Sequence, residues 1–299
     1  MKGLSISAMA FTTFMTVLVA GYSGELLPLI EKKTNGSINW TLGIIQAVGI
    51  GKPDETGSTQ QLDAKEKALY HAKNNARRHL IAMVRNIRID SHRVVASIAD
   101  TNYSISAKIN EMVFKTPEIE KLRKYRADGT VEVHMKIGLY GGLSQLVLPD
   151  EIQQIEPLKT VRKIRKPSIQ QAGESSAPEI FTGLVIDARG IDLKPALVPR
   201  LLDENGQEVF GAAFVSREFA VQWGTGGYAI DIKASRNNPR VGQNPLVVKG
   251  LRTSEPGHSD IIISNTDAAK LLSSSEHLSF LKECRVLIVV NPPSGYRQF

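Results

Sequence analysis

A row of alanines constrains the fold of this chain more than any other feature. Small apolar side chains recur at every fourth position, and a leucine and a valine continue the row: Ala64, Ala68, Ala72, Ala76, Leu80 and Val84. This spacing places them on one face of a long amphipathic helix. Because alanine is small, a helix with such a face can lie close to a sheet.

Strand patterns on both sides of this helix supply the sheet. Residues 37–50 alternate apolar side chains with polar ones or glycine, which predicts a single strand with one buried face. Residues 131–139 alternate more regularly and follow an Asp-Gly turn, so they predict a β-hairpin with residues 122–126. Between helix and hairpin, residues 94–98 fit either a helix or a strand, and Ser104 can cap a shorter helix.

A second globular pattern begins near residue 180. Short elements are predicted as strands at 183–187, 197–202, 207–210, 228–232, 246–250, 260–263 and 285–290, and as helices at 216–223 and 268–272. The predicted fold class is therefore α+β: two small two-layer α/β sandwich domains with largely antiparallel sheets, joined by a basic polar linker. The predicted boundaries are 37–148 for the first domain, 149–179 for the linker, 180–291 for the second domain and 292–299 for a tail.

Composition excludes several classes of protein. The 299 residues include 42% hydrophobic and 22% charged side chains, which is the mix of a globular protein and not of a disordered, collagen-like or coiled-coil chain. The single cysteine, Cys284, excludes an internal disulfide and a cysteine-based zinc site. The net charge is +7.

Residues 1–24 predict export. Lys2 is followed by an apolar stretch that carries no charge before Glu25 and has small residues near its end, which is the layout of a signal peptide. An uncleaved membrane anchor and the first buried helix of a cytoplasmic domain are the two alternatives. We expect a periplasmic protein that is exported through a signal peptide, with outer-membrane association as a further option.

Motifs for catalysis or cofactor binding are largely missing. Residues 49–53 lack the first glycine and the Ser/Thr of a phosphate loop, and no histidines have the spacing of zinc ligands. His258, Ser259 and Asp260 are the residue types of a catalytic triad, but adjacent side chains on an extended backbone point apart. Cys284 fits a small buried residue. We expect no cofactor and no metal.

Two patches of charge are the remaining candidates for a site. Asp187, Arg189 and Asp192 form a polar bend after a buried strand, where paired carboxylates could perform acid–base catalysis or simply stabilise a turn. The linker carries five basic residues that could contact an anionic surface such as lipid headgroups or cell-wall polymer: Lys159, Arg162, Lys163, Arg165 and Lys166. Nucleic acid is not expected, because no aromatic residues interleave with them.

The first domain resembles a known family. The resemblance rests on Trp40, Gly43 and residues 46–49, on the helix with alanines from 64 to 76, and on Tyr125, residues 128–133, Leu139, Gly141 and Gly142. These residues are similar to the N-terminal domain of flagellar assembly protein T and to related small outer-membrane lipoproteins, over about residues 37–148. The second half resembles domains of uncharacterised bacterial envelope proteins.

This resemblance implies an exported, non-enzymatic envelope protein, since flagellar assembly protein T helps to build a periplasmic ring around the motor. The chain lacks the acylated cysteine of the lipoproteins, which favours a soluble periplasmic protein. We expect it to bind envelope proteins, flagellar basal-body components among them, or its own copies, with peripheral contact to membrane or cell wall as a further option. The alternatives are a periplasmic enzyme using the Asp187 bend and an adaptor that binds through the basic linker.

Overall fold

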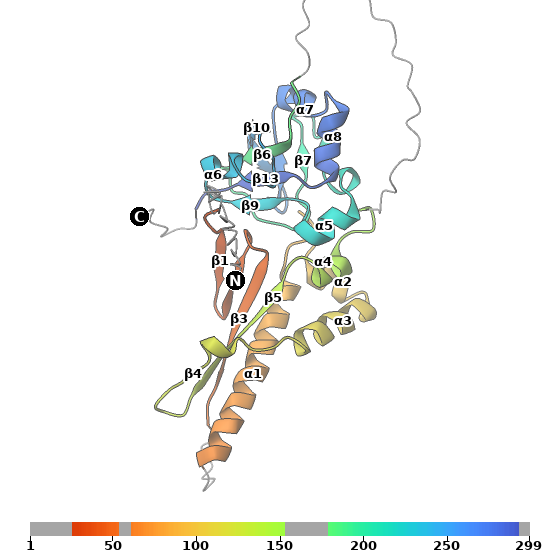
Figure 1. The fold of residues 1–299 in the computed structure, drawn as a ribbon. Helices are drawn as coiled ribbons and strands as arrows, with labels where there is room; N and C mark the ends of the chain where they lie inside the picture. Colours follow the sequence, from red (N-terminus) through yellow and green to blue (C-terminus); the bar gives the residue numbers. More distant parts are fainter. Residues whose placement is uncertain (1–25, 54–60, 153–178, 293–299) are drawn as a thin grey trace, which may run out of the picture.

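The computed structural model describes residues 26–53, 61–152 and 179–292. Figure 1 shows two domains stacked end to end, with the second domain at the top and the long helix α1 running down the first. The predicted signal peptide, the five basic residues of the linker and the tail beyond residue 292 lie outside the described residues. None of the helices within the described residues is long and apolar enough to cross a membrane.

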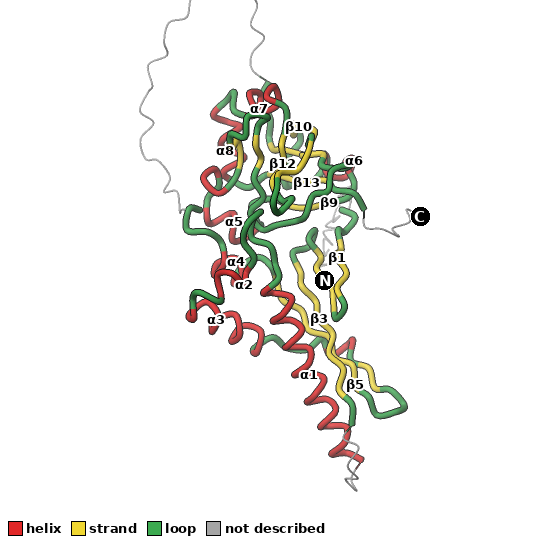
Figure 2. The backbone as a smooth tube through the Cα atoms, turned by 180° about the vertical axis from the view of Figure 1, so that it is seen from behind, coloured by secondary structure: helices red, strands yellow, loops and turns green. Residues whose placement is uncertain are grey.

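The first domain is one antiparallel sheet covered by helices. Its strand order is β1-β2-β3-β5-β4, with bounds β1 Ile30–Lys33, β2 Gly36–Asn39, β3 Ile44–Gly51, β4 Lys124–Tyr125 and β5 Val131–Gly138. The helices are α1 Gln61–Arg85, α2 Val95–Ala99, α3 Tyr103–Phe114, η1 Glu120–Leu122 and α4 Gly142–Val147. Helix α1 packs along β3 and β5, and α3 packs beside α1 (Figure 2).

The alanine row forms the contact between α1 and the sheet, as predicted. Ala68, Ala72 and Ala76 have no exposed surface. The strand opposite them carries Gly49 and Gly51, and a Cβ atom at Gly49 would collide with the backbone of Ala72 and Ala76. Helix and strand therefore meet backbone to backbone, which requires glycine on one side and alanine on the other.

The prediction of a single strand over residues 37–50 is wrong, because the segment folds back on itself. Strands β2 and β3 form an antiparallel hairpin. At the turn Gly43 adopts a φ of +63°, and the Asn39 side-chain oxygen accepts a hydrogen bond from the Leu42 amide at 2.9 Å. In the sequence, apolar residues continue to alternate through this turn, although Trp40 is buried and Leu42 is exposed. The alternation therefore gives no sign that the chain reverses direction here.

Two smaller expectations in this domain also change. Asn102, and not Ser104, caps α3, and its side-chain oxygen accepts a hydrogen bond from the Ile105 amide at 3.2 Å. Residues 94–98, which fit either a helix or a strand, form the N-cap and most of the short helix α2. The hairpin predicted around the Asp-Gly turn is confirmed as β4 and β5.

The second domain contains two four-stranded sheets, of orders β10-β6-β13-β9 and β11-β12-β7-β8. The strands are β6 Gly183–Asp187, β7 Leu201–Leu202, β8 Glu208–Phe210, β9 Gly227–Ala229, β10 Pro245–Lys249, β11 Arg252–Ser254, β12 Asp260–Ile262 and β13 Val286–Val289. The helices are η2 Ala212–Phe214, α5 Arg217–Trp223, α6 Ile232–Arg236, α7 Asn265–Leu271 and α8 Ser275–Lys282. The sequence pattern misses β11, α6 and α8.

The α+β class with two domains is confirmed, and most strand pairs are antiparallel. One sheet differs from the expectation, since β10-β6-β13-β9 is parallel throughout. Its central strands β6 and β13 are buried along almost their entire length. Strands covered on both faces are continuous apolar runs and do not alternate, and both strands have that pattern in the sequence.

A continuous hydrophobic core runs through both domains. The backbone amides of Leu197 and Val198 donate hydrogen bonds to the carbonyls of Arg88 and Ile89, at 3.0 and 2.7 Å. These two bonds connect the segment that follows α1 to the second domain. The domains are thus joined by backbone contacts as well as by side chains.

Aromatic side chains complete the junction between the domains. The ring of Trp40 meets that of Tyr228 edge-on, with centroids 5.7 Å apart. Tyr140 lies against Gly43 and Gly224, where a Cβ atom on either glycine would collide with its ring. Both glycines have positive φ angles, +63° and +75°, so each satisfies a turn and leaves space for the tyrosine.

Candidate functional site

A cleft of about 760 Å³ lies between the two domains. One wall consists of residues 28–33, which contain β1, together with Trp40 and Arg88 of the first domain. The other wall consists of residues 191–195 and 290–292 of the second domain. It is the larger of the two hollows that stand out on the described residues.

The second-domain wall follows from the direction of the parallel sheet. Residues 191–195 come after β6 and residues 290–292 come after β13, and these two strands are neighbours in the sheet. The carboxyl ends of adjacent parallel strands therefore meet at the cleft. In open α/β sheets this end is where ligands bind, because the loops that leave it can diverge.

The first-domain wall is organised around Glu31. Its carboxylate accepts a hydrogen bond from the Trp40 indole at 3.0 Å and pairs with Lys33 at 2.5 Å. Burial alone would raise the pKa of Glu31, but the hydrogen bonds from Lys33 and Trp40 and the charge of Arg88 outweigh it and lower the pKa. Glu31 is therefore a carboxylate anion that holds the side chains of Trp40 and Lys33 in place.

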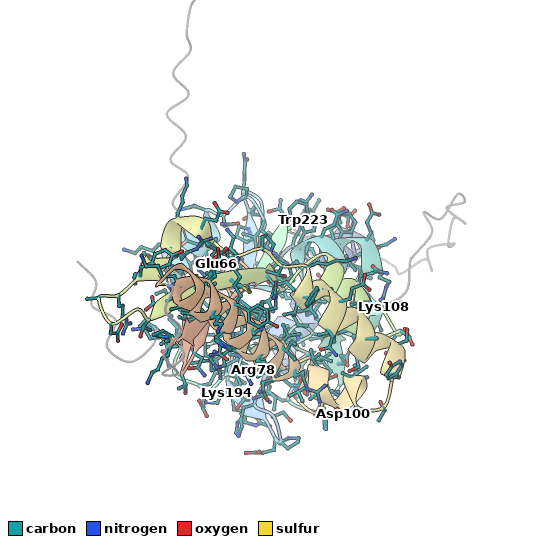
Figure 3. The ribbon with its side chains drawn as sticks, turned by 90° about the horizontal axis from the view of Figure 1, so that it is seen from below. Glu66, Arg78, Asp100, Lys108, Lys194 and Trp223 are labelled. Atoms are coloured by element: carbon teal, nitrogen blue, oxygen red, sulfur yellow. The ribbon has the colours of Figure 1, made fainter. Side chains whose placement is uncertain are left out.

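The cleft carries an excess of positive charge. Lys33 pairs with Glu31, and across the cleft Lys194 pairs with Asp192 at 2.7 Å. Lys32 and Arg88 also line the cleft; the charge of Arg88 acts on Glu31, whereas no described carboxylate lies within ion-pair distance of Lys32. Lys32 is thus available to an anionic ligand. In the view of Figure 3, Lys194 and Lys108 of α3 are well separated.

The three residues of the polar bend do not converge on one point. Asp187 and Arg189 form a two-point ion pair, at 2.8 Å from Nε and 2.9 Å from Nη2. Asp192 instead lies on the cleft wall with Lys194. The hydrogen bonds from Arg189 lower the pKa of Asp187 to about 2, and a carboxylate with such a pKa is a weak base. The arrangement suits a structural ion pair better than acid–base catalysis.

Replacing Arg189 should move the titration of its partner. We expect the Asp187 carboxyl to titrate near pH 2 in the native protein and closer to the ordinary value of 3.8 in Arg189→Gln. Since the folded-state pKa lies below the unfolded one, the pair stabilises the fold above about pH 4. That contribution is lost as the pH falls towards 2. Carbon NMR of the carboxyl across this range measures both pKa values, and an unchanged pKa in the variant would contradict the assignment.

Within the described residues, no three His, Cys, Asp or Glu side chains come together as a metal site would require. Cys284 is buried, and that burial raises its thiol pKa to about 12. The side chains of His258, Ser259 and Asp260 have separate partners: the Thr253 hydroxyl and Glu255 for the histidine, the Lys194 carbonyl for the serine and Arg200 for the aspartate. These three residues therefore do not act together.

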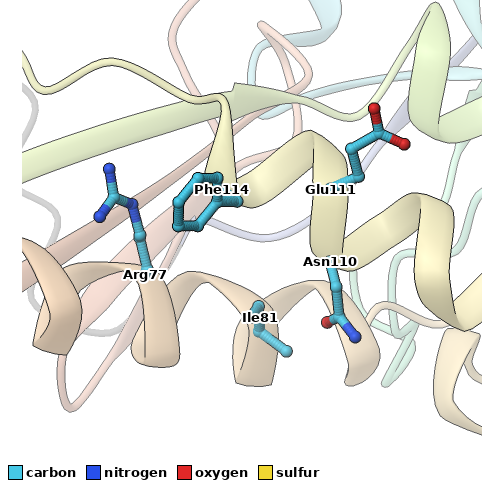
Figure 4. A pocket seen from close by; sticks show the side chains of 5 residues that line it. All are labelled: Arg77, Ile81, Asn110, Glu111 and Phe114. Atoms are coloured by element: carbon cyan, nitrogen blue, oxygen red, sulfur yellow. The ribbon is translucent and has the colours of Figure 1, made fainter.

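A second, smaller hollow of about 370 Å³ lies between α1 and α3 (Figure 4). Arg77 and Ile81 of α1 face Asn110, Glu111 and Phe114 of α3 across it. The Arg77 guanidinium lies 4.8 Å from the centre of the Phe114 ring, a cation–π contact that already uses the charge facing the hollow. This hollow is therefore a weaker candidate than the cleft.

The sequence alone does not reveal the cleft. Its walls come from segments that are far apart in the chain, and β1 carries no clear strand pattern because its side chains are only half-buried or exposed. Of the predicted candidates that the structure describes, only Asp192 lies in the cleft. The basic candidates at 159–166 lie outside the described residues.

Together the fold and the cleft define a two-domain α+β protein whose second domain is built on a four-stranded parallel sheet. Residues 183–292 match the family model for the second domain of Tp0624 from Treponema pallidum. This half of the chain is therefore similar to that domain. No curated protein matches the chain. The match does not reach residues 37–148, so the resemblance of the first domain to flagellar assembly protein T stays a prediction.

Proposed function

We propose that this chain is a non-enzymatic protein of the bacterial cell envelope, exported to the periplasm, that binds another envelope protein during assembly of a larger structure. Components of a flagellar ring are the partners that the resemblance of the first domain favours. The observation that carries the proposal is the cleft between the domains, which has a net positive lining and carboxylates already engaged in ion pairs.

Two further observations support a binding role. The walls of the cleft belong to domains that share one core and exchange backbone hydrogen bonds, so the cleft is a preformed surface. Preformed surfaces lose little conformational entropy on binding. The candidate catalytic residues Asp187 and Arg189 neutralise each other, and the pKa of the Cys284 thiol is raised far above neutral pH.

Crosslinking in intact cells tests this function. A photoreactive residue replaces Lys194 in the cleft or, as the matched control, Lys108 on the exposed face of α3. We expect illumination to attach a specific envelope protein at position 194 and little or none at position 108. Recovery of the chain solely from the cytoplasmic fraction, or the absence of an adduct from every position sampled over the surface, would overturn the proposal.

A further inference from the structure

Strand β1 is an edge of the sheet that the described residues form, and some of its backbone groups point away from that sheet. In its pairing with β2, Ile30 faces Asn39 and Lys32 faces Ser37, and Leu29 accepts a hydrogen bond from the Trp40 amide at 2.9 Å. In an antiparallel ladder, bonded and non-bonded residue pairs alternate. The bond at Leu29 therefore directs Glu31 and Lys33 towards β2.

The same alternation directs the amide and carbonyl groups of Ile30 and Lys32 outwards. Neither residue's backbone has another hydrogen-bond partner among the described residues. An edge with unpaired groups is a template for one more strand. Most sheet edges are open to bulk solvent, whereas this one forms a wall of the cleft.

The charges around the edge select what can pair with it. Lys32, on the strand, lacks a described carboxylate partner, whereas Lys33 pairs with Glu31 and the charge of Arg88 acts on Glu31 as well. A second copy of β1 would bring its own lysines against these, and like charges on adjacent strands are destabilising. Glutamate or aspartate at the partner-strand positions that face the same side of the sheet as Lys32 would instead pair with it.

We propose that the cleft binds an extended acidic segment of a partner protein, which adds to β1 as a further strand of the first-domain sheet. The inference rests on the proposed binding function and names the kind of partner. The backbone of the segment pairs with Ile30 and Lys32, which accounts for the affinity. Its carboxylates face Lys32, which accounts for the preference. This is the strand-addition mode of peptide recognition.

A defined peptide tests the proposal on the purified full-length protein. The probe is a short fluorescent peptide in which glutamate alternates with valine and threonine, and the control probe has lysine in place of glutamate. We expect the acidic peptide to bind and to slow hydrogen exchange at the amides of Ile30 and Lys32, and the basic peptide not to bind. Protection of a different region, or equal binding of both peptides, would overturn the proposal.

Variants at one position separate backbone pairing from charge. Lys32→Ala removes the charge only and should weaken acidic-peptide binding about threefold. Lys32→Pro also removes the outward amide without breaking a bond to β2, and should weaken it about tenfold or more. Lys32→Glu keeps the amide and should shift the preference towards the basic peptide. Melting curves confirm that each variant is folded, and equal affinity of the Pro and Ala variants would contradict strand addition.

The crosslinking experiment distinguishes the failure of this inference from the failure of the proposed function. A partner captured in the cell at surface positions outside the cleft, with no peptide bound at β1, keeps the function and removes the inference. Self-association that Lys32→Pro abolishes, without binding of the acidic peptide, would overturn the inference in favour of a second copy as the occupant. Capture at position 194 together with protection of Ile30 and Lys32 supports both.

Discussion

Substituting Gly49 with valine should unfold the first domain or destabilise it by more than about 3 kcal/mol. A side chain at this position of β3 would collide with backbone atoms of Ala72 and Ala76 on α1. Backbone cannot move aside as a flexible side chain does, so the helix would have to separate from the sheet along its main contact. Urea unfolding followed by circular dichroism measures the loss.

The matched control is Gly138→Val in the neighbouring strand β5. Gly138 is exposed, and the nearest atom to a Cβ placed there is the Tyr140 carbonyl oxygen at 3.3 Å. The same substitution in the same sheet should therefore change stability by less than about 1 kcal/mol, since valine also favours the strand conformation. Equal effects at the two positions would show that the alanine face of α1 does not determine the approach of helix and sheet.

Replacing Arg240 with methionine should destabilise the protein by about 3 kcal/mol. The guanidinium donates to three backbone carbonyls, those of Cys284 at 2.9 Å, Trp223 at 2.8 Å and Gly224 at 2.7 Å. Burial lowers the pKa of Arg240, and no carboxylate offsets that burial among the groups that act on it. Methionine fills a similar volume but leaves the three carbonyls without their donor.

Two further variants test whether the lost hydrogen bonds cause the destabilisation of Arg240→Met. Arg236→Met, at an exposed position of α6, should lie within about 0.5 kcal/mol of the native protein. Arg240→Lys should be intermediate, because one ammonium group lacks the planar fork that reaches three carbonyls at once. Chemical denaturation at constant pH compares the set. A native-like Arg240→Met would mean that water replaces the guanidinium at these carbonyls.

The periodicity of apolar residues predicts those helices and strands whose buried face can be read from their own sequence. The alanine face of α1 and the alternation of β5 are long and regular, and both elements lie where the sequence places them. The turn between β2 and β3 is not predictable in this way. Trp40 belongs to the apolar alternation but is buried against Tyr228 of the other domain, a contact that no local pattern contains.

The candidate site depends even more on long-range contacts. The cleft requires the first-domain edge β1 and the loops after β6 and β13 to meet, and these segments are separated by most of the chain. Asp192 is recognisable as a polar residue after a buried strand, and it does lie on the cleft wall. The contribution of Lys32 arises from its lack of a described carboxylate partner, which becomes visible only in three dimensions.

The hydrogen bonds from Leu197 and Val198 to Arg88 and Ile89 have a consequence for the integrity of the molecule. Together with the shared core, they hold the two halves by non-covalent attachment, independently of the peptide connection through residues 153–178. Proteolytic nicking within that connection would thus yield two fragments that stay associated. The two halves would therefore remain together without the covalent connection between them.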